Sequence, residues 1–323
     1  PAAGRRHRRG GFVSGDGETR CGVVGVGTLG AAIAERLASQ GLPVTAYDID
    51  PARAEALAEH GVAAAASPRE LAERSDVVLL LLPDTPEVLE ALAGEDGLEA
   101  GLAEGSAVLL ASTVTPATPQ ELAERLGERG IALLDTPVSG GPVAARDGSL
   151  RIMVGGSEEG YERARPLLEA VGRPVHVGPV GHGEIAKLAN NLMGSVIVLG
   201  IAEGLALAAK AGADLDRVRE AIGGGSGSSW ILEEWMPRTV LAGNVDAHFA
   251  VRLMAKDMRL VGEYAEELGV PHAAGELARE TFDRVRAEGH GDRDFSVLVA
   301  LRAAEAGAPL ADVDLDRSGE RQP

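Results

Sequence analysis

A glycine-rich turn, Gly25-Val26-Gly27-Thr28-Leu29-Gly30, constrains the fold of this chain more than any other feature of its sequence. It follows an apolar run and opens a segment, Leu29–Gln40, whose apolar residues recur with helical spacing. In such a strand–turn–helix unit the first glycine permits the tight turn, the second lets a pyrophosphate approach the backbone, and the third lets helix and strand pack closely. Free N–H groups at the helix N-terminus favour an anion there. The pattern predicts a dinucleotide site that includes Gly25, Gly27, Thr28, Leu29 and Gly30.

An acidic residue stands where such a site needs one. The second predicted strand ends in Tyr47-Asp48, 21 residues after Gly27. A carboxylate at this point accepts hydrogen bonds from the adenosine ribose, whereas the 2′-phosphate of NADP would meet like charge. Because Asp50 adds a second acid close by, we predict that the cofactor is NAD rather than NADP.

Apolar runs alternate with helically spaced segments from residue 21 to about 178. The runs predicted as strands are Val23–Val26, Pro43–Tyr47, Val77–Leu82, Ala107–Leu110, Ile131–Leu134, Arg151–Val154 and Val175–Val177. Segments predicted as helices between them include Leu29–Gln40, Pro51–His60 and Pro116–Arg129. Such alternation is typical of βαβ units, in which a mostly parallel sheet has helices on both faces.

The pattern changes after Gly183. Glu184–Ala211 is predicted as one nearly unbroken helix, and further helices are expected at 214–222, 229–241, 250–268, 274–288 and 295–306, with no credible strand. The fold class is therefore an α/β Rossmann dinucleotide-binding domain followed by an all-α domain, joined by a long interdomain helix. We predict an NAD-binding Rossmann domain over 21–180 and an all-helical substrate and dimerisation domain over 181–309, between a leader, 1–20, and a tail, 310–323.

Charge and cysteine content exclude several classes of protein. The 31 Lys and Arg residues against 49 Asp and Glu residues leave a formal net charge of −18, which argues against a sequence-independent nucleic-acid binder or a membrane-surface protein. The single cysteine, Cys21, excludes an internal disulfide and a multi-cysteine zinc site, and it favours a cytoplasmic protein. No apolar run approaches the roughly 18 residues that a membrane span requires. We expect no metal site and neither nucleic acid nor membrane as a partner.

Both ends of the chain are polar. Residues 1–20 are rich in Gly and Arg and are predicted to form a disordered leader, with a nucleic-acid arm or a twin-arginine export signal as alternatives. The export signal is disfavoured because no apolar stretch follows Arg8-Arg9. The tail, 310–323, is likewise predicted to be disordered.

Lysine and asparagine are rare in this chain. Only three of the 31 basic residues are lysines: Lys187, Lys210 and Lys256. Asparagine also occurs three times, at Asn190, Asn191 and Asn244. Three of these six residues fall within five positions of the long predicted helix. Lys187 and Asn191 are four residues apart and therefore share one helix face. A lysine retained against this composition suggests a proton donor or acceptor, with a substrate-orienting amide one turn away.

A second glycine motif ends a strand of the first predicted domain. It reads Leu134-Asp135-Thr136-Pro137-Val138-Ser139-Gly140-Gly141-Pro142. Paired glycines free backbone N–H groups to converge on an oxyanion, to which Ser139 adds its hydroxyl. A purely structural loop is the alternative interpretation.

Taken together, these motifs resemble those of the β-hydroxyacid dehydrogenases, which include 3-hydroxyisobutyrate dehydrogenase and tartronate semialdehyde reductase. The resemblance covers about 21–308 and rests on the glycine turn, Leu82-Pro83, Ser112-Thr113-Val-Thr-Pro116, the Ser139 motif, Gly181-His-Gly183 with Lys187 and Asn191, and Lys256-Asp257. It implies that Lys187 is the catalytic lysine, that Ser139, Gly140, Gly141 and Asn191 bind the substrate, and that Leu82, Pro83, Thr113 and Lys256 line the cofactor site.

The resemblance implies an NAD-dependent enzyme that interconverts a small 3-hydroxy acid and its semialdehyde by hydride transfer, in a homodimer or homotetramer. One lysine with a lowered pKa serves as base in oxidation and as acid in reduction, with His182 as an alternative base. Three other interpretations remain: an imine reductase, a decarboxylating dehydrogenase of the 6-phosphogluconate type, and a catalytically silent nucleotide-binding protein. Retention of both Lys187 and Asn191 favours the hydroxy acid dehydrogenase.

Overall fold

The computed structural model describes residue 12 and residues 18–310 and 313–315, which fall into two compact units. The first unit extends to Lys187 and the second begins at Leu188. Most of the predicted leader and tail lies outside the described residues.

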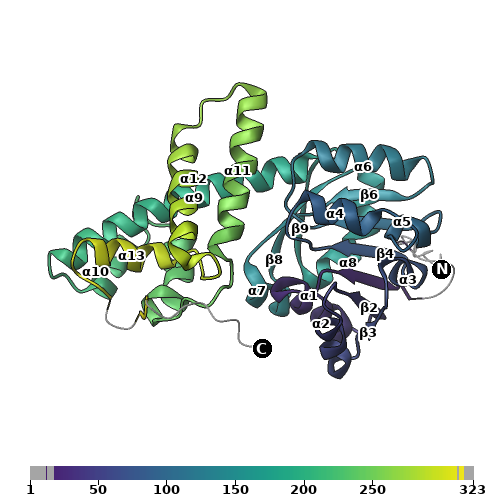
Figure 1. Ribbon diagram of the computed structural model, residues 1–323, viewed down its shortest axis with the longest axis horizontal. Coiled ribbons are helices and arrows are strands. Elements are labelled where there is room, and N and C mark those ends of the chain that lie inside the picture. The colour runs from purple at the N-terminus through teal and green to yellow at the C-terminus, as the bar shows by residue number, and fades with distance from the viewer. Residues whose placement is uncertain (1–11, 13–17, 311–312, 316–323) are drawn as a thin grey trace, which may run out of the picture. The chain divides into compact units, whose positions relative to one another are not determined.

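A single mixed sheet forms the centre of the first unit (Figure 1). Its strand order is β3-β2-β1-β4-β5-β6-β8-β7, with β9 paired to β8. The pairs from β3 to β6 are parallel, whereas β8 runs antiparallel to β6 and β7. The strands are β1 (Cys21–Val24), β2 (Val44–Tyr47), β3 (Ala63–Ala64), β4 (Val77–Leu80), β5 (Ala107–Leu110), β6 (Ala132–Asp135), β7 (Val138–Ser139), β8 (Leu150–Gly155) and β9 (Gly172–Gly178).

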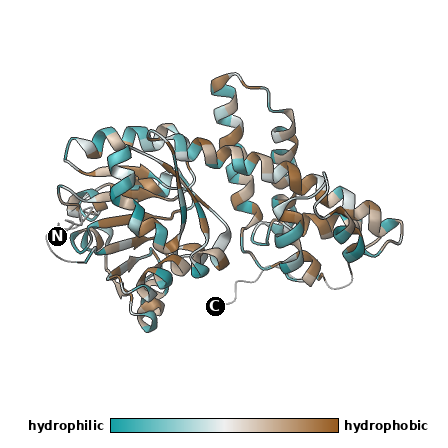
Figure 2. Ribbon diagram, turned by 180° about the vertical axis from the view of Figure 1, so that it is seen from behind, coloured by the Kyte–Doolittle hydropathy of each residue, from teal (hydrophilic) through white to brown (hydrophobic). Residues whose placement is uncertain are grey.

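Helices cover both faces of this sheet, and its strands β1, β4 and β5 are accordingly apolar and buried along their whole length. Along β4, Val77 and Leu79 pack into one core cluster and Val78 and Leu80 into the other, so successive side chains reach opposite faces. Figure 2 shows these strands coloured as hydrophobic between helices of mixed colour. The helices are α1 (Thr28–Ser39), α2 (Pro51–Glu55), α3 (Pro68–Glu73), α4 (Thr85–Leu92), α5 (Leu98–Gly101), α6 (Ala117–Gly127), α7 (Gly141–Asp147) and α8 (Glu158–Val171).

The predicted Rossmann architecture is confirmed, with differences in detail. Two short strands, β3 and β7, were not predicted, because two residues are too few to show a periodicity. The segment predicted as one helix from Pro51 to His60 is the short α-helix α2 followed by a 3₁₀ helix over Ala56–His60.

Phe12, within the segment predicted as a disordered leader, is buried in the core of the first unit. The Arg163 guanidinium lies 4.0 Å from the centre of its ring, in a cation–π contact. Phe12 itself therefore packs on the fold, because a large aromatic side chain gains much from burial.

The thiol of Cys21, at the start of β1, is also buried. Burial raises the pKa of this thiol to about 12, and the nearby Asp76 carboxylate acts in the same direction. The thiol donates only a long contact to the Thr19 carbonyl oxygen, at 3.8 Å.

The second unit is helical. Helix α9 (His182–Lys210) begins in the first unit and continues into the second, which adds α10 (Leu215–Ile222), α11 (Val251–Leu268), α12 (Ala273–Val285) and α13 (Val297–Glu305). In the described part of this unit, β pairing is limited to two isolated bridges, Asp246 with Arg293 and Ala250 with Asp294. The continuous helix predicted at 229–241 is wrong: a π turn over Ile231–Trp235 gives way to 3₁₀ turns, where Pro237 lacks the N–H that an α-helix needs.

Helix α9 overturns the expectation that no apolar run approaches membrane-spanning length. It has 29 residues, and a window of it with a mean hydropathy of 2.0 makes it long and apolar enough to cross a membrane, by length and composition alone. The expectation failed because, after Glu184 and Lys187 in its first turns, the helix has no charged residue over 188–202. Core helices of proteins outside membranes pass the same test, so the finding carries no conclusion about a membrane. Only 33% of the window is buried in the chain by itself.

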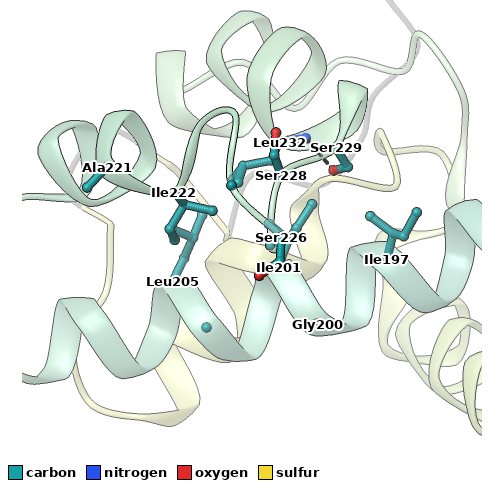
Figure 3. A pocket seen from close by; sticks show the side chains of 13 residues that line it. Ile197, Gly200, Ile201, Leu205, Ala221, Ile222, Ser226, Ser228, Ser229 and Leu232 are labelled. Carbon is teal, nitrogen blue, oxygen red and sulfur yellow. Dashed lines mark hydrogen bonds between the residues drawn. The ribbon is translucent and has the colours of Figure 1, made fainter.

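A groove of about 610 Å³ runs along α9 in the second unit. Figure 3 shows Ile197, Ile201 and Leu205 of α9 on one side of it. Ile222 of α10 and the serines of the loop 223–229 lie on the other side.

Candidate active site

The glycine turn between β1 and α1 has the geometry that its sequence predicts. Gly25 has a φ of +86°, and a Cβ atom there would stand 2.4 Å from the Leu81 carbonyl oxygen. A Cβ on Gly30 would stand 1.9 Å from the Gly25 carbonyl oxygen, so only glycine lets α1 start so close to the turn. Around Gly27, by contrast, no atom of the described chain lies within 4 Å of the Cβ position. The backbone of the protein therefore packs closely against Gly25 and Gly30, and the turn leaves space at Gly27.

The N-terminus of α1 is available to an anion. Gly27 is its N-cap and no described side chain caps it, so the first turn keeps N–H groups for another acceptor. An open glycine, uncapped N–H groups and the positive end of the helix dipole together fit the pyrophosphate of a dinucleotide.

Asp48 fixes the position of this turn. Its side chain is only 7% exposed. One oxygen accepts a hydrogen bond from Val26 N at 2.9 Å and the other from Asp50 N at 3.0 Å. Each carboxylate oxygen has a second lone pair. Asp48 can therefore hold the turn and still accept from a ribose hydroxyl.

Arg53 stands beside this carboxylate. Its guanidinium lies 3.8 Å from Asp48 and 3.5 Å from Asp50, and half of the side chain is exposed. Both acids therefore engage Arg53, an arrangement that the sequence did not reveal.

The loops after β4 and β5 are joined by a serine. Leu82 N donates to Ser112 Oγ at 2.7 Å, and that hydroxyl donates to the Leu80 carbonyl oxygen at 3.2 Å. Leu82, Pro83 and Thr113 therefore follow two neighbouring strands, at the carboxyl edge of the sheet that also holds the glycine turn. Ligands of doubly wound sheets bind at this edge, where the strand order reverses.

Lys187 is buried in the first unit. Its side chain is 7% exposed, and Nζ donates a hydrogen bond of 2.8 Å to the Val138 carbonyl oxygen. The residue after Val138 is Ser139, where β7 ends, and the turn continues through Gly140 and Gly141 with φ of +127° and +71°. The structure thus brings Lys187 to the second glycine motif, as the sequence predicts for a shared site.

The start of α9 is held by a carboxylate that the sequence analysis assigned no role. Asp135, the last residue of β6, accepts hydrogen bonds from Gly181 N at 2.8 Å and Glu184 N at 2.9 Å. Burial raises the pKa of Asp135, and the backbone N–H groups that it accepts from act in the opposite direction. Asp135 belongs to the same sequence motif as Ser139, but only the folded chain shows which helix it caps.

In the second unit, Asn191 and Lys256 meet at Asp257. Asn191 Nδ2 donates to one oxygen of Asp257 at 2.5 Å, and Lys256 Nζ forms an ion pair with the other at 2.7 Å. All three side chains are largely buried, with Asp257 at 2% exposed. Asp257 is a further residue that the sequence analysis named only within a motif.

His182, the alternative base, is the exposed first residue of α9. Among the described residues, no cluster of His, Cys, Asp or Glu could hold a metal ion.

Over most of its length the chain is similar to known dehydrogenases. A family model for the NAD binding domain of 6-phosphogluconate dehydrogenase matches residues 20–181, and one for the NAD-binding region of NADP-dependent 3-hydroxyisobutyrate dehydrogenase matches 181–302. An NAD-dependent L-serine dehydrogenase of Pseudomonas aeruginosa is 36% identical over 86% of this chain and 96% of its own. A 2-hydroxy-3-oxopropionate reductase of Escherichia coli is 34% identical over 90% and 100%. The solved structure of a 3-hydroxyisobutyrate dehydrogenase from Salmonella typhimurium, 32% identical, superposes with a TM-score of 0.79 over 88% of this chain and 100% of that one.

Proposed function

Since this chain belongs to the β-hydroxyacid dehydrogenase family, we propose that it oxidises a small 3-hydroxy acid to its semialdehyde with NAD, or runs the reverse reduction, with Lys187 as general acid and base. That it is an oxidoreductase acting on the hydroxyl group of hydroxy acids follows from its relatives. The cofactor, the lysine mechanism and the assembly are the proposal.

The observation that carries the proposal is the buried amine of Lys187. Its bond to the Val138 carbonyl oxygen uses one N–H and fixes the direction of the others, beside the Ser139 turn. Burial removes part of the hydration that stabilises a charged amine, which favours the neutral form that a general base requires.

In the oxidation, the neutral Lys187 amine takes the proton of the substrate hydroxyl while the carbinol carbon loses its hydride. NAD supplies the hydride acceptor when it is bound. In the reduction, the Lys187 ammonium returns the proton to the new alkoxide oxygen. Ser139 and the N–H groups of the Gly140–Gly141 turn bind the substrate carboxylate in this scheme, and Asn191 binds its hydroxyl.

The choice of NAD rests on Asp48 and Asp50. A 2′-phosphate would approach two carboxylates, and Arg53 is already engaged by both. We expect kcat/KM to favour NAD over NADP at least about tenfold, which needs only ~1.4 kcal/mol. A preference for NADP would show that Arg53 leaves the acids and binds the phosphate.

The reaction is tested by a substrate panel with the purified full chain. NADH formation is followed with L-serine and 3-hydroxyisobutyrate, and NADH consumption with tartronate semialdehyde. A turnover that saturates with one of these and that Lys187→Ala abolishes supports the proposal. No turnover with any of them, in a protein that still binds NADH, would contradict it and point to a silent homologue or to an imine reductase.

We also propose that a second copy of this chain covers α9. Exposed residues recur on this helix at spacings of four and three, the seam pattern of paired helices: Met193, Ile197, Gly200, Gly204 and Leu207. Met193 is 60% and Leu207 75% exposed, and the two glycines allow another backbone to approach closely. A homodimer or homotetramer would remove this apolar surface from water.

A further inference from the structure

The segment that joins β6 to β7 contacts the start of α9 at two places. Asp135 accepts from the backbone N–H groups of Gly181 and Glu184, before and within the first turn. Three residues later, the Val138 carbonyl oxygen accepts from the Lys187 amine. One short segment therefore holds both the backbone of this helix and the side chain that projects from its second turn.

Two glycines make room for the Asp135 carboxylate. A Cβ on Gly155 of β8 would stand 2.3 Å from one of its oxygens, and a Cβ on Gly183 of α9 would stand 2.7 Å from the other. Asp135 itself is fully buried. A side chain enclosed on both sides and bonded through both oxygens has one position, so the helix that it caps has one position as well.

A second contact joins α9 to the neighbouring strand. Glu184, buried in the first turn, accepts a hydrogen bond from Val114 N at 3.4 Å, in the loop after β5. The helix start is therefore fixed to the carboxyl ends of two adjacent parallel strands, where the cofactor and substrate motifs lie.

We propose that Asp135 is a positioning residue for the reaction: by capping α9 it sets where the Lys187 amine stands. The effect of Asp135 on the reaction rate rests on the proposed function of Lys187, whereas its effect on the position of the amine does not. Without the cap, α9 can shift along the strand ends and the Lys187 amine moves with it, whereas the Val138 carbonyl stays with its strand. A displacement of about 1 Å at a reacting group costs on the order of 10²-fold in rate.

The chain offers a direct readout of the Lys187 amine that needs no activity. It has only three lysines, so protein grown with lysine labelled by ¹³C at Cε gives three side-chain signals, and Lys187→Arg assigns one of them. In Asp135→Asn, an amide replaces one acceptor oxygen facing two N–H donors. We expect the Lys187 signal and its pH titration to shift and the Lys210 signal to stay.

The matched control is Asp76→Asn. Asp76 is also a buried aspartate that accepts from a backbone N–H, that of Arg20 at 2.9 Å, but it lies at the opposite end of the strands. This variant weakens the bond to the Arg20 backbone together with the ion pair to the Arg20 guanidinium, and it should leave the Lys187 signal unchanged. Asp135→Ser, which keeps an oxygen able to cap, provides a folded variant if Asp135→Asn does not fold, and should shift the signal less.

Kinetic measurements distinguish the positioning role of Asp135 from the proposed hydroxy acid reaction. Asp135→Asn should lower kcat about tenfold or more with little change in KM for NAD, and it should have no further effect in a Lys187→Ala background, because both act through one amine. An unchanged Lys187 signal in a folded Asp135 variant would overturn the positioning role. A shifted signal in a chain that turns over no hydroxy acid would uphold it and reject the proposed reaction instead.

Discussion

At the scale of single residues, the side chains of the site make contacts with residues that are far from them in the sequence. Lys187 could be predicted, because it is one of three lysines and lies four residues from one of three asparagines. Its bond to Val138 could not, since 49 residues separate the two and only the sheet brings them together. The same holds for Asp257, whose two contacts come from α9 and from its own helix.

The role of Lys187 as a base predicts the behaviour of two variants. Lys187→Ala should lower kcat about 10²–10⁴-fold, the usual contribution of a positioned acid–base group, while NADH still binds. Lys187→Arg should be nearly as damaging, because a guanidinium keeps its charge and cannot accept the proton. The pH profile of wild-type oxidation should rise on an alkaline limb that both variants lack. Near-normal kcat in Lys187→Arg would mean that the position supplies charge alone, and His182 would be the next base to examine.

Asp135 predicts a pH dependence of stability. Burial raises its pKa in the folded chain, so the unfolded chain releases this proton at lower pH. The stability that the protonated form provides is complete below the unfolded pKa of about 3.9 and is lost as the pH rises through the higher folded pKa. The difference in unfolding free energy between wild type and Asp135→Asn should therefore shrink from about pH 4 upward. Urea titrations of both proteins at several pH values measure it, and a difference that grows with pH would contradict the burial argument.

At the scale of helices and strands, the period of the apolar residues predicted the long elements. Strands buried on both faces gave unbroken apolar runs, and α1, α6, α9 and α11 lie within a few residues of their predicted ranges. The failures were local: β3 and β7 are too short for a pattern, and Pro237 breaks the helix expected at 229–241. In each case a tertiary contact or a missing N–H decided the conformation.

The close approach of α1 to its own turn can be tested at Gly30. Alanine normally stabilises a helix by roughly 0.5–1 kcal/mol relative to glycine. At Gly30 a Cβ would collide with the Gly25 carbonyl oxygen, so Gly30→Ala should lower the melting temperature and weaken NADH binding. Gly127→Ala, in α6 with no described atom within 4 Å of the new Cβ, is the control and should be neutral or stabilising. Equal effects of the two variants on NADH fluorescence titrations would rule out the steric explanation.

At the scale of the whole molecule, the two units differ in how completely they bury apolar residues. Both faces of the sheet in the first unit are covered, whereas α9 leaves an apolar seam exposed in the second. The sequence predicted the succession of a Rossmann domain and an all-α domain. It did not reveal the seam, since a periodicity shows that a helix has an apolar face but not whether its own chain covers it.

The seam predicts the assembly. Leu207→Glu places a charge on the proposed interface and should shift the protein toward the monomer in sedimentation velocity. Leu277→Glu, the same substitution at another exposed leucine, on α12, should leave the assembly as it is. If wild type is a monomer at micromolar concentration, or if both variants dissociate alike, α9 is not the contact.

The single buried thiol makes the stability of the first unit directly measurable in the native protein. Cys21 begins the central strand β1, and with its pKa raised to about 12 it is almost wholly protonated and shielded from a disulfide reagent. Labelling then requires an opening that exposes β1, so its rate relative to an unfolded peptide gives the population of the open form. Because no other cysteine is present in the sequence, each labelled molecule records one such opening. NADH should slow the labelling in proportion to its occupancy of the glycine turn, which would report cofactor binding without any substrate at all.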